Sequence, residues 1–155
     1  MIQRIQSLYL SMTTLISLLF LKGNILKFIN IEGIRYAVNF SGLGQITGEN
    51  KFELISPMVP LSVMFILIPL ISLIAVFLFR YRKVQVRTTL FLIIISVMLV
   101  AATAYYGISV IRDYEVSLVP GYKMFLPLLI LILSLLAYRG IRKDEELVRS
   151  YDRLR

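Results

Sequence analysis

The residues of this chain that could carry chemistry are hydroxyls, carboxylates, lysines and arginines. Its 155 residues include no cysteine, no histidine and no tryptophan. A thiolate zinc site, a redox disulfide, a histidine-ligated haem and a Ser-His or Cys-His catalytic pair therefore lack the atoms that they need. The sequence also carries no cofactor-binding motif, and we expect no cofactor.

Five carboxylates between residues 32 and 115 could in principle converge on one pocket. An enzyme hypothesis would require Glu53, Asp113 and Glu115 to meet there. Their spacing matches no metal-binding or acid-base motif, so solvation of loops is the simpler explanation and we do not expect an enzyme. The five carboxylates are Glu32, Glu49, Glu53, Asp113 and Glu115.

Hydroxyl and small residues form two stripes at helical spacing. Such stripes let membrane helices approach closely and hydrogen-bond, so we predict two helix-packing faces. The alternative is a small carrier or channel for an uncharged or lipidic solute, in which the hydroxyls of both stripes face a common cavity. One stripe is Ser7, Ser11 and Thr14, and the other includes Ser96, Thr103 and Gly107.

Basic residues gather in two segments, residues 80–87 and residues 139–155. The second segment also has apolar residues at i, i+1, i+4 and i+7, which predicts a short amphipathic helix. We expect these segments to contact anionic lipid headgroups, a membrane or cytosolic protein partner, or both. The candidate contact residues are Arg80, Arg82, Lys83, Arg87, Arg142, Lys143, Leu147, Arg149, Tyr151 and Arg153.

The elements that must position these residues are membrane helices. Charged residues are absent from residues 5–21, 54–79, 88–111 and 124–138. Since about 20 apolar residues cross a bilayer, we predict spans at about 5–21, 57–79, 88–111 and 124–138, within a four-helix transmembrane bundle over residues 1–138. The fourth segment is short, but its flanking Lys123 and Arg139 can extend to reach water. The alternative of helices buried in a soluble protein fits poorly, because residues 126–136 are apolar on almost all sides.

Positive charge predicts the orientation in the membrane. Of the 17 lysines and arginines, eleven belong to one side and six to the other. The positive-inside rule then places both termini and the basic segments in the cytoplasm. The net charge of +8 is therefore explained first by insertion and orientation in the membrane. Because the mean hydropathy of +0.81 also argues against a soluble protein, we expect no nucleic-acid partner. A cleaved signal peptide is the alternative for the first segment, but a small-x-small cleavage site is missing after Leu21.

The outer connection over residues 22–53 is predicted to contain a β-hairpin. Residues 25–31 and 34–40 alternate in polarity around Glu32-Gly33, which is typical of two paired strands. Residues 45–54 could add a third short strand. The hairpin is either a connector that closes the bundle or an extracytoplasmic cap for a ligand or partner. The predicted fold class is an all-α membrane protein with this small hairpin and a C-terminal cytoplasmic helix.

Both ends of the chain carry motifs that are specific in combination. The N-terminal motif is Met1-Ile2-Gln3-Arg4-Ile5-Gln6-Ser7-Leu8-Tyr9-Leu10, and the C-terminal one runs from Ile141 through Lys143-Asp144-Glu145-Glu146 to Arg155. With the basic segment at 80–87 and the spacing of the spans, the chain resembles an uncharacterised family of small four-span inner-membrane proteins of Bacteroidetes. The resemblance implies a bacterial inner membrane and four helices. It points to no particular activity, substrate or functional residue. The predicted spans contain no charged residue, and no catalytic motif accompanies the patterned, charged tail. For this reason we expect a non-enzymatic accessory or scaffold subunit that binds partners through its basic segments.

Overall fold

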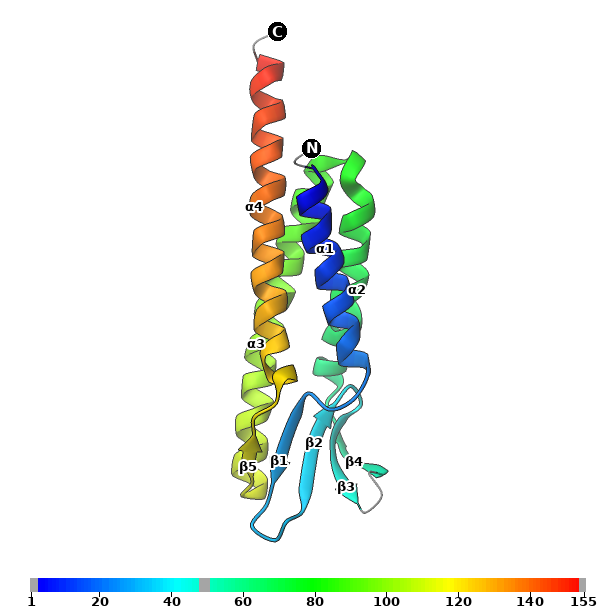
Figure 1. Ribbon diagram of the computed structural model, residues 1–155, viewed down its shortest axis with the longest axis vertical. Coiled ribbons are helices and arrows are strands. Elements are labelled where there is room, and N and C mark those ends of the chain that lie inside the picture. Colours follow the sequence, from blue (N-terminus) through cyan, green and yellow to red (C-terminus); the bar gives the residue numbers. More distant parts are fainter. Residues whose placement is uncertain (1–2, 48–50, 154–155) are drawn as a thin grey trace.

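The computed structural model describes the backbone of residues 3–47 and 51–153 and the side chains of residues 5–19, 21–47 and 51–146. Within these residues, four α-helices run side by side and a five-stranded antiparallel sheet lies at one end of them (Figure 1). The chain is mostly helical, as expected. The prediction of an all-α fold with a single small hairpin is wrong, because a complete sheet forms outside the helices.

Three helical segments are long and apolar enough to cross a bilayer: Val59–Arg80, Arg82–Tyr114 and Tyr122–Glu146. The apolar part of the first helix, Ile5–Leu18, is shorter, so a fourth span stays a prediction. The α-helices are α1 (Gln3–Leu18), α2 (Val59–Phe77), α3 (Arg82–Tyr114) and α4 (Leu126–Arg153), and the 3-10 helices are η1 (Leu19–Leu21), η2 (Leu78–Arg80) and η3 (Tyr122–Phe125).

Two segments that the sequence suggested were separate from the spans are continuous with them. The predicted fourth span and the predicted tail helix form one helix, α4, which Gly140 does not interrupt. Most of the basic segment 80–87 is not a loop but the first turns of α3, which begins at Arg82. Lysine and arginine are good helix formers, so a span can continue as a helix where its side chains reach water.

The sheet has the strand order β4-β3-β2-β1-β5. The predicted hairpin pairing is confirmed in β1 and β2, whose register runs from Leu26 opposite Val38 to Ile29 opposite Arg35. β5 comes from the α3–α4 connection and pairs with β1, so it joins two distant parts of the chain. The strands are β1 (Leu26–Ile29), β2 (Arg35–Asn39), β3 (Gly42–Thr47), β4 (Lys51–Pro57) and β5 (Ser117–Val119).

Two glycines of β3 take positions that other residues would not accommodate. Gly42 has a φ of +137°, which favours glycine. A Cβ atom on Gly44 would collide with the ring of Phe52 on the neighbouring β4. The ring therefore occupies the space above Gly44, and the glycine permits the close approach of the two strands.

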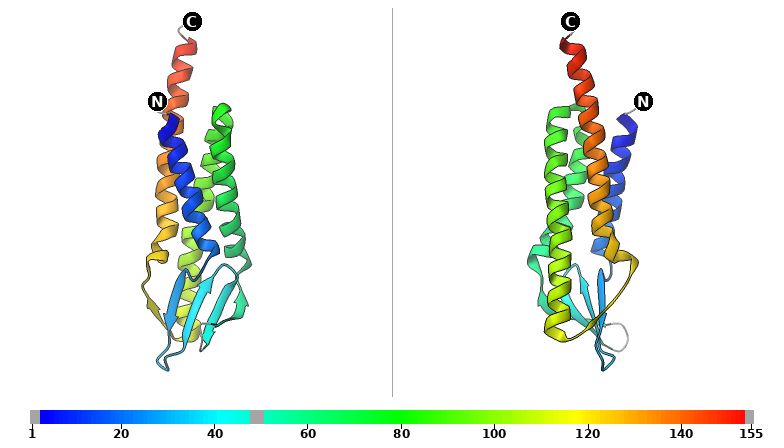
Figure 2. Two further views of the ribbon diagram at one scale, coloured as in Figure 1. Left: turned by 45° about the vertical axis from the view of Figure 1, so that its right-hand side comes forward. Right: turned by 90° about the vertical axis from the view of Figure 1, so that its left-hand side faces the viewer.

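α3 connects the helical bundle to the sheet. Its 33 residues extend about 50 Å at ~1.5 Å per residue, which exceeds the ~30 Å of bilayer hydrocarbon. Its last turns lie beside the sheet (Figure 2), where Val110 of α3 and Phe28 of β1 belong to one buried cluster. The rings of Tyr36 and Tyr114 also pack there, 5.3 Å apart.

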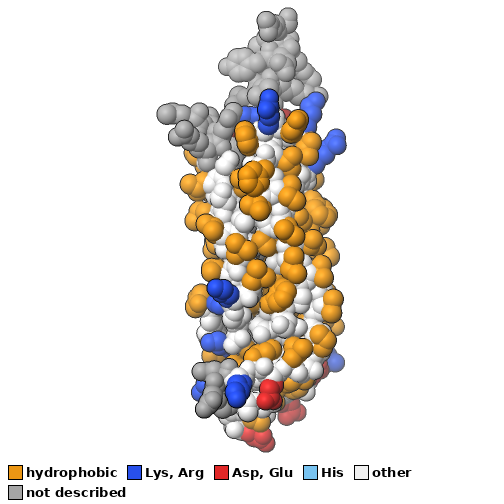
Figure 3. Space-filling view, turned by 90° about the vertical axis from the view of Figure 1, so that its right-hand side faces the viewer, with side chains coloured by type: hydrophobic (Ala, Val, Ile, Leu, Met, Phe, Trp, Pro, Cys, Tyr) orange, Lys and Arg blue, Asp and Glu red, His pale blue; other side chains and the backbone are white. Residues whose placement is uncertain are grey.

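The surface of the bundle is apolar along its length. Figure 3 shows hydrophobic side chains over the middle of the molecule, with most of the visible acidic side chains at the sheet end. Large apolar residues on all four helices remain exposed, such as Leu15 (65%) on α1, Leu70 (50%) on α2 and Ile132 (53%) on α4. Such a surface is typical of helices that face lipid.

Candidate functional site

The predicted contact residues lie at the end of the bundle opposite the sheet. Both ends of the chain and the connection between α2 and α3 lie at this end, and α4 continues past the other helices (Figure 1). The connection is tight because η2 ends at Arg80 and α3 starts at Arg82. Five predicted contact residues are exposed here, namely Arg80, Lys83, Arg87, Arg142 and Lys143, while Arg82 is half-buried.

A buried carboxylate joins three helices at this end. Asp144 of α4 is 6% exposed, and its Oδ2 accepts a hydrogen bond of 2.7 Å from Nε2 of Gln6 on α1. The same oxygen lies 3.5 Å from a guanidinium nitrogen of Arg82 at the start of α3. A buried carboxylate is costly unless it is paired and hydrogen-bonded. Gln6 and Arg82 supply both contacts, and we call these three residues the Asp144 cluster.

Two further residues fit the helices together near the Asp144 cluster. A Cβ atom on Gly140 would lie 2.8 Å from Cγ of Gln6, so the glycine leaves room for the glutamine side chain. Gln85, 4% exposed, donates a hydrogen bond of 2.9 Å to the carbonyl of Ala75 near the end of α2. All four helices are therefore joined at this end by buried polar contacts.

Sequence reasoning missed the buried roles of Gln6, Gln85 and Asp144. Gln6 and Gln85 are uncharged polar residues at matching ends of α1 and α3, which is a usable signal for an interhelical contact. Asp144 gives no such signal, because it is surrounded by charges in the sequence and its partner Gln6 is 138 residues away.

The exposed side of α4 near Asp144 carries a surface ion pair. Nε of Arg142 donates to a carboxylate oxygen of Glu146 at 3.1 Å. The hydrogen bond with Glu146 raises the pKa of Arg142 above its ordinary value. The next predicted contact residues lie on the last part of α4, where side chains fall outside the described residues: Leu147, Arg149, Tyr151 and Arg153.

The predicted packing residues take different positions in the structure. Oγ1 of Thr14 on α1 lies 2.8 Å from Oγ of Ser72 on α2, so these hydroxyls bridge two helices. Ser96 and Thr103 are buried and donate to carbonyls of their own helix. Ser11 is exposed, and the buried face of α1 is instead Gln6, Leu10, Thr13 and Ser17.

The two remaining packing candidates differ in their surroundings. Ser7 is half-buried on α1. Gly107 of α3 lies against β1, since a Cβ atom there would be 3.4 Å from Cδ1 of Leu26. Thr103 and Gly107 line an apolar pocket, whereas Ser11, Thr14 and Ser96 are not among its lining residues. The common hydroxyl-lined cavity required by the carrier hypothesis is therefore not formed by this pocket.

The carboxylates at the sheet end are spread over several elements. Glu53 lies on β4, at the opposite edge of the sheet from β5, while Glu115 immediately follows α3. Among the side chains that the structure describes, no three acidic groups lie together so that they could hold a metal ion. Glu49 lies outside the described residues.

Comparison with known proteins places the chain in a family. Residues 2–154 match a family described as Domain of unknown function (DUF4293). No curated protein and no solved structure matches the chain. The match covers all four helices and the sheet, and it carries no assigned activity.

Proposed function

Because the chain belongs to the DUF4293 family, whose function is unknown, we propose a function from the geometry of its two ends. The protein is an integral protein of the bacterial inner membrane with four spans and cytoplasmic termini. It acts as a non-enzymatic accessory or scaffold subunit, and it binds a partner through α4 and the basic start of α3.

The outer face of α1 supports its role as the fourth span. Its exposed residues include Ile5 (55%), Leu8 (54%) and Leu15 (65%), while Gln6 and Thr14 bond to α4 and α2 on the inner side. An apolar face this open to solvent would be unfavourable in water, and lipid would cover it. With η1, the helical segment reaches from Gln3 to Leu21, close to the lower limit for a span.

The charge distribution supports cytoplasmic termini. Both ends of the chain lie at one end of the bundle (Figure 1), as an even number of spans requires. The residues at that end include the cationic groups of Arg80, Lys83 and Lys143, and cytoplasmic connections are enriched in lysine and arginine. The sheet would then lie on the extracytoplasmic side of the membrane. Its open edges require a position outside the hydrocarbon.

The observation that carries the partner-binding proposal is the extension of α4. The helix continues without a break to Arg153, beyond the ends of the other helices (Figure 1). Asp144 anchors the base of this extension to α1 and α3. A helix that is fixed at its base presents a pre-organised surface, so less conformational entropy is lost when a partner binds.

The orientation can be tested by cysteine labelling, because the natural chain has no cysteine. Ser41→Cys lies at the sheet, and Lys83→Cys lies at the opposite end. In cells with a permeable outer membrane and an intact inner membrane, we expect a membrane-impermeant maleimide to label the Ser41→Cys variant and not the Lys83→Cys variant. Labelling of the Lys83→Cys variant alone would show that the orientation is the reverse of the proposed one.

Partner binding can be tested by removing residues 147–155, which keeps Asp144 and its contacts. Crosslinking in native membranes followed by purification should lose one or more protein adducts in this truncated form. The matched variant keeps the extension and replaces Arg80, Lys83 and Arg87 by glutamine, which separates the role of α4 from that of α3. If the adducts of the truncated and full-length chains are the same, the extension does not bind a partner.

A further inference from the structure

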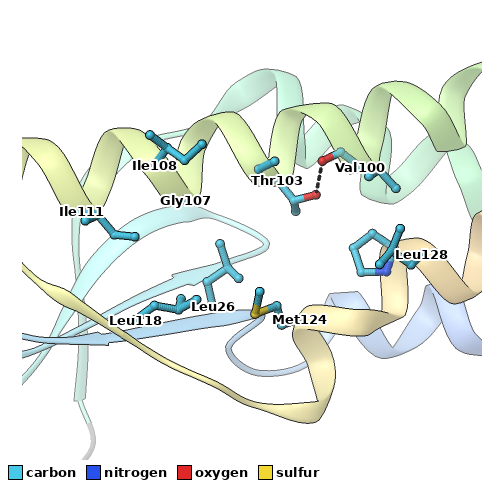
Figure 4. A pocket seen from close by; sticks show the side chains of 11 residues that line it. Leu26, Val100, Thr103, Gly107, Ile108, Ile111, Leu118, Met124 and Leu128 are labelled. Atoms are coloured by element: carbon cyan, nitrogen blue, oxygen red, sulfur yellow. Dashed lines mark hydrogen bonds between the residues drawn. The ribbon is translucent and has the colours of Figure 1, made fainter.

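An apolar pocket lies where α3, α4 and the sheet meet (Figure 4). Its volume is about 300 Å³, and its walls include Leu26 of β1, Leu118 of β5 and Leu128 of α4. Thr103 is the one lining residue with a polar side chain, and its hydroxyl is hydrogen-bonded to carbonyls of Leu99 and Val100. The pocket walls therefore favour an apolar ligand.

The pocket exists because few side chains fill the space between α3 and the start of α4. Gly107 has no side chain, and its backbone lies against Leu26. The strand β5 and the turn of η3 lead the chain away from α3 before α4 begins at Leu126. Figure 4 shows Ile108 and Ile111 on one side, with Leu118 and Met124 facing them across the gap.

In the membrane arrangement proposed above, on which this inference rests, the pocket straddles the boundary between hydrocarbon and water. The wall formed by β1 and β5 belongs to a sheet with open edges, which cannot lie in hydrocarbon. The opposite wall continues into the apolar surface of α4, where Leu128 is 46% exposed. Tyr105 (67% exposed) and Tyr122 (76% exposed) flank this level, and tyrosines are enriched at membrane interfaces.

We propose that this pocket binds one acyl chain of an anionic phospholipid and holds part of that chain above the hydrocarbon layer. The open side of the pocket at Ile108 (66% exposed) and Leu128 lets a chain enter from the bilayer. Arg112 is exposed one helical turn beyond Ile108. Its guanidinium is placed to contact the phosphate, because the headgroup remains at the interface while the chain turns into the pocket.

The test uses purified protein in phosphatidylcholine vesicles that contain phosphatidylglycerol with a diazirine at the middle of one acyl chain. After irradiation, mass spectrometry locates the crosslinks. We expect the label to concentrate on residues 100–111 and 124–128, about tenfold above the exposed apolar surface of α2 at residues 66–74. Labelling spread over all helices in proportion to exposure would overturn the proposal, since it would indicate ordinary boundary lipid.

A matched pair of variants tests the pocket itself. Ala104→Phe places a ring in the pocket, whereas Ala101→Phe makes the same change on an exposed part of α3 that does not line it. Labelling of the pocket should fall about tenfold in the first variant and persist in the second. Unchanged labelling in the Ala104→Phe variant would overturn the proposal. If that variant does not fold, the distribution of label in the natural protein still decides.

The headgroup is tested with Arg112→Gln and a control, Lys51→Gln, which removes an exposed cation from β4. The natural protein should label more strongly with the phosphatidylglycerol probe than with a phosphatidylcholine probe of the same chain. Arg112→Gln should abolish this preference, and Lys51→Gln should keep it. Equal labelling by both probes in the natural protein would overturn the proposed preference for an anionic headgroup.

Discussion

The two ends of the molecule are held together by different interactions. At the sheet end, apolar side chains pack between the strands and α3, with Phe28 and Val110 almost fully buried. At the opposite end, the helices meet through buried polar groups, the Asp144 cluster and the Gln85–Ala75 hydrogen bond. One end resembles the core of a water-soluble domain, and the other resembles the interior of a membrane protein.

The solvent around each end accounts for this difference. If the sheet lies in water, as we propose, burial of apolar surface drives its packing at roughly 25 cal/mol per Å². Between membrane helices that force is absent, because lipid chains are as apolar as the side chains themselves. Directional contacts and small residues such as Gly140 then determine how the helices fit.

The largest effect is expected from Phe28→Ala at the sheet end. Phe28 is 1% exposed, and truncation of a buried phenylalanine typically costs about 3–5 kcal/mol. Hydrogen exchange should accelerate strongly in β1, β2 and β5, while the amides of α1 and the start of α3 stay protected. Ile29→Ala is the control, because Ile29 lies on the other face of β1 and is 38% exposed.

A smaller effect is expected from Asp144→Ala at the opposite end. The change leaves Gln6 without its carboxylate partner and Arg82 without its ion pair, which should cost about 2–3 kcal/mol. Exchange should rise in α1 and in α4 around residue 144 and stay unchanged in the sheet. Glu146→Ala removes only an exposed pair with Arg142 and should leave exchange unchanged.

The two changes together test whether the ends are independent. Sites with no shared contacts have nearly additive effects, so the double variant should show the sum of the two exchange patterns. If either single change raises exchange evenly along the chain, the ends form one cooperative unit and the contrast between them is wrong.

The sequence predicted what depends on local pattern. Long charge-free segments indicated the helices, and three of them are confirmed as long and apolar enough to cross a bilayer. Alternating polarity around Gly33 indicated the pairing of β1 with β2, which is confirmed. The expected membership of an uncharacterised family is also confirmed over residues 2–154.

What the sequence did not predict depends on contacts between distant residues. β5 has only three residues, and its partner β1 lies about 90 residues earlier in the chain. Asp144 lies in the charged segment 139–155, and no local pattern there distinguishes a carboxylate that meets Gln6 from one that faces water. The apolar pocket needs five elements together, namely β1, α3, β5, η3 and α4, so no single segment reveals it.

The smallest expected effect concerns the hydrogen bond between Thr14 and Ser72, which lies in the middle of the bundle between the two ends. Thr14→Val keeps the shape of the side chain and removes its hydroxyl, and Ser72→Ala removes the partner. Interhelical hydrogen bonds of this kind contribute about 0.6 kcal/mol on average, because each hydroxyl can also bond to a carbonyl of its own helix. Thr14 does so with Leu10, and Ser72 with Pro69.

A double-mutant cycle measured by detergent-induced unfolding in mixed micelles isolates this contribution. Thr13→Val is the control, because Thr13 is buried on the same helix and its hydroxyl donates to the carbonyl of Tyr9 within α1. A coupling energy near 0.6 kcal/mol would show that the hydrogen bond in the middle of the bundle stabilises the fold less than the Asp144 cluster does. A coupling energy as large as the free-energy cost of Asp144→Ala would mean that polar contacts of similar strength hold α1 along its whole length. The Asp144 cluster would then have no special role in holding the helices together.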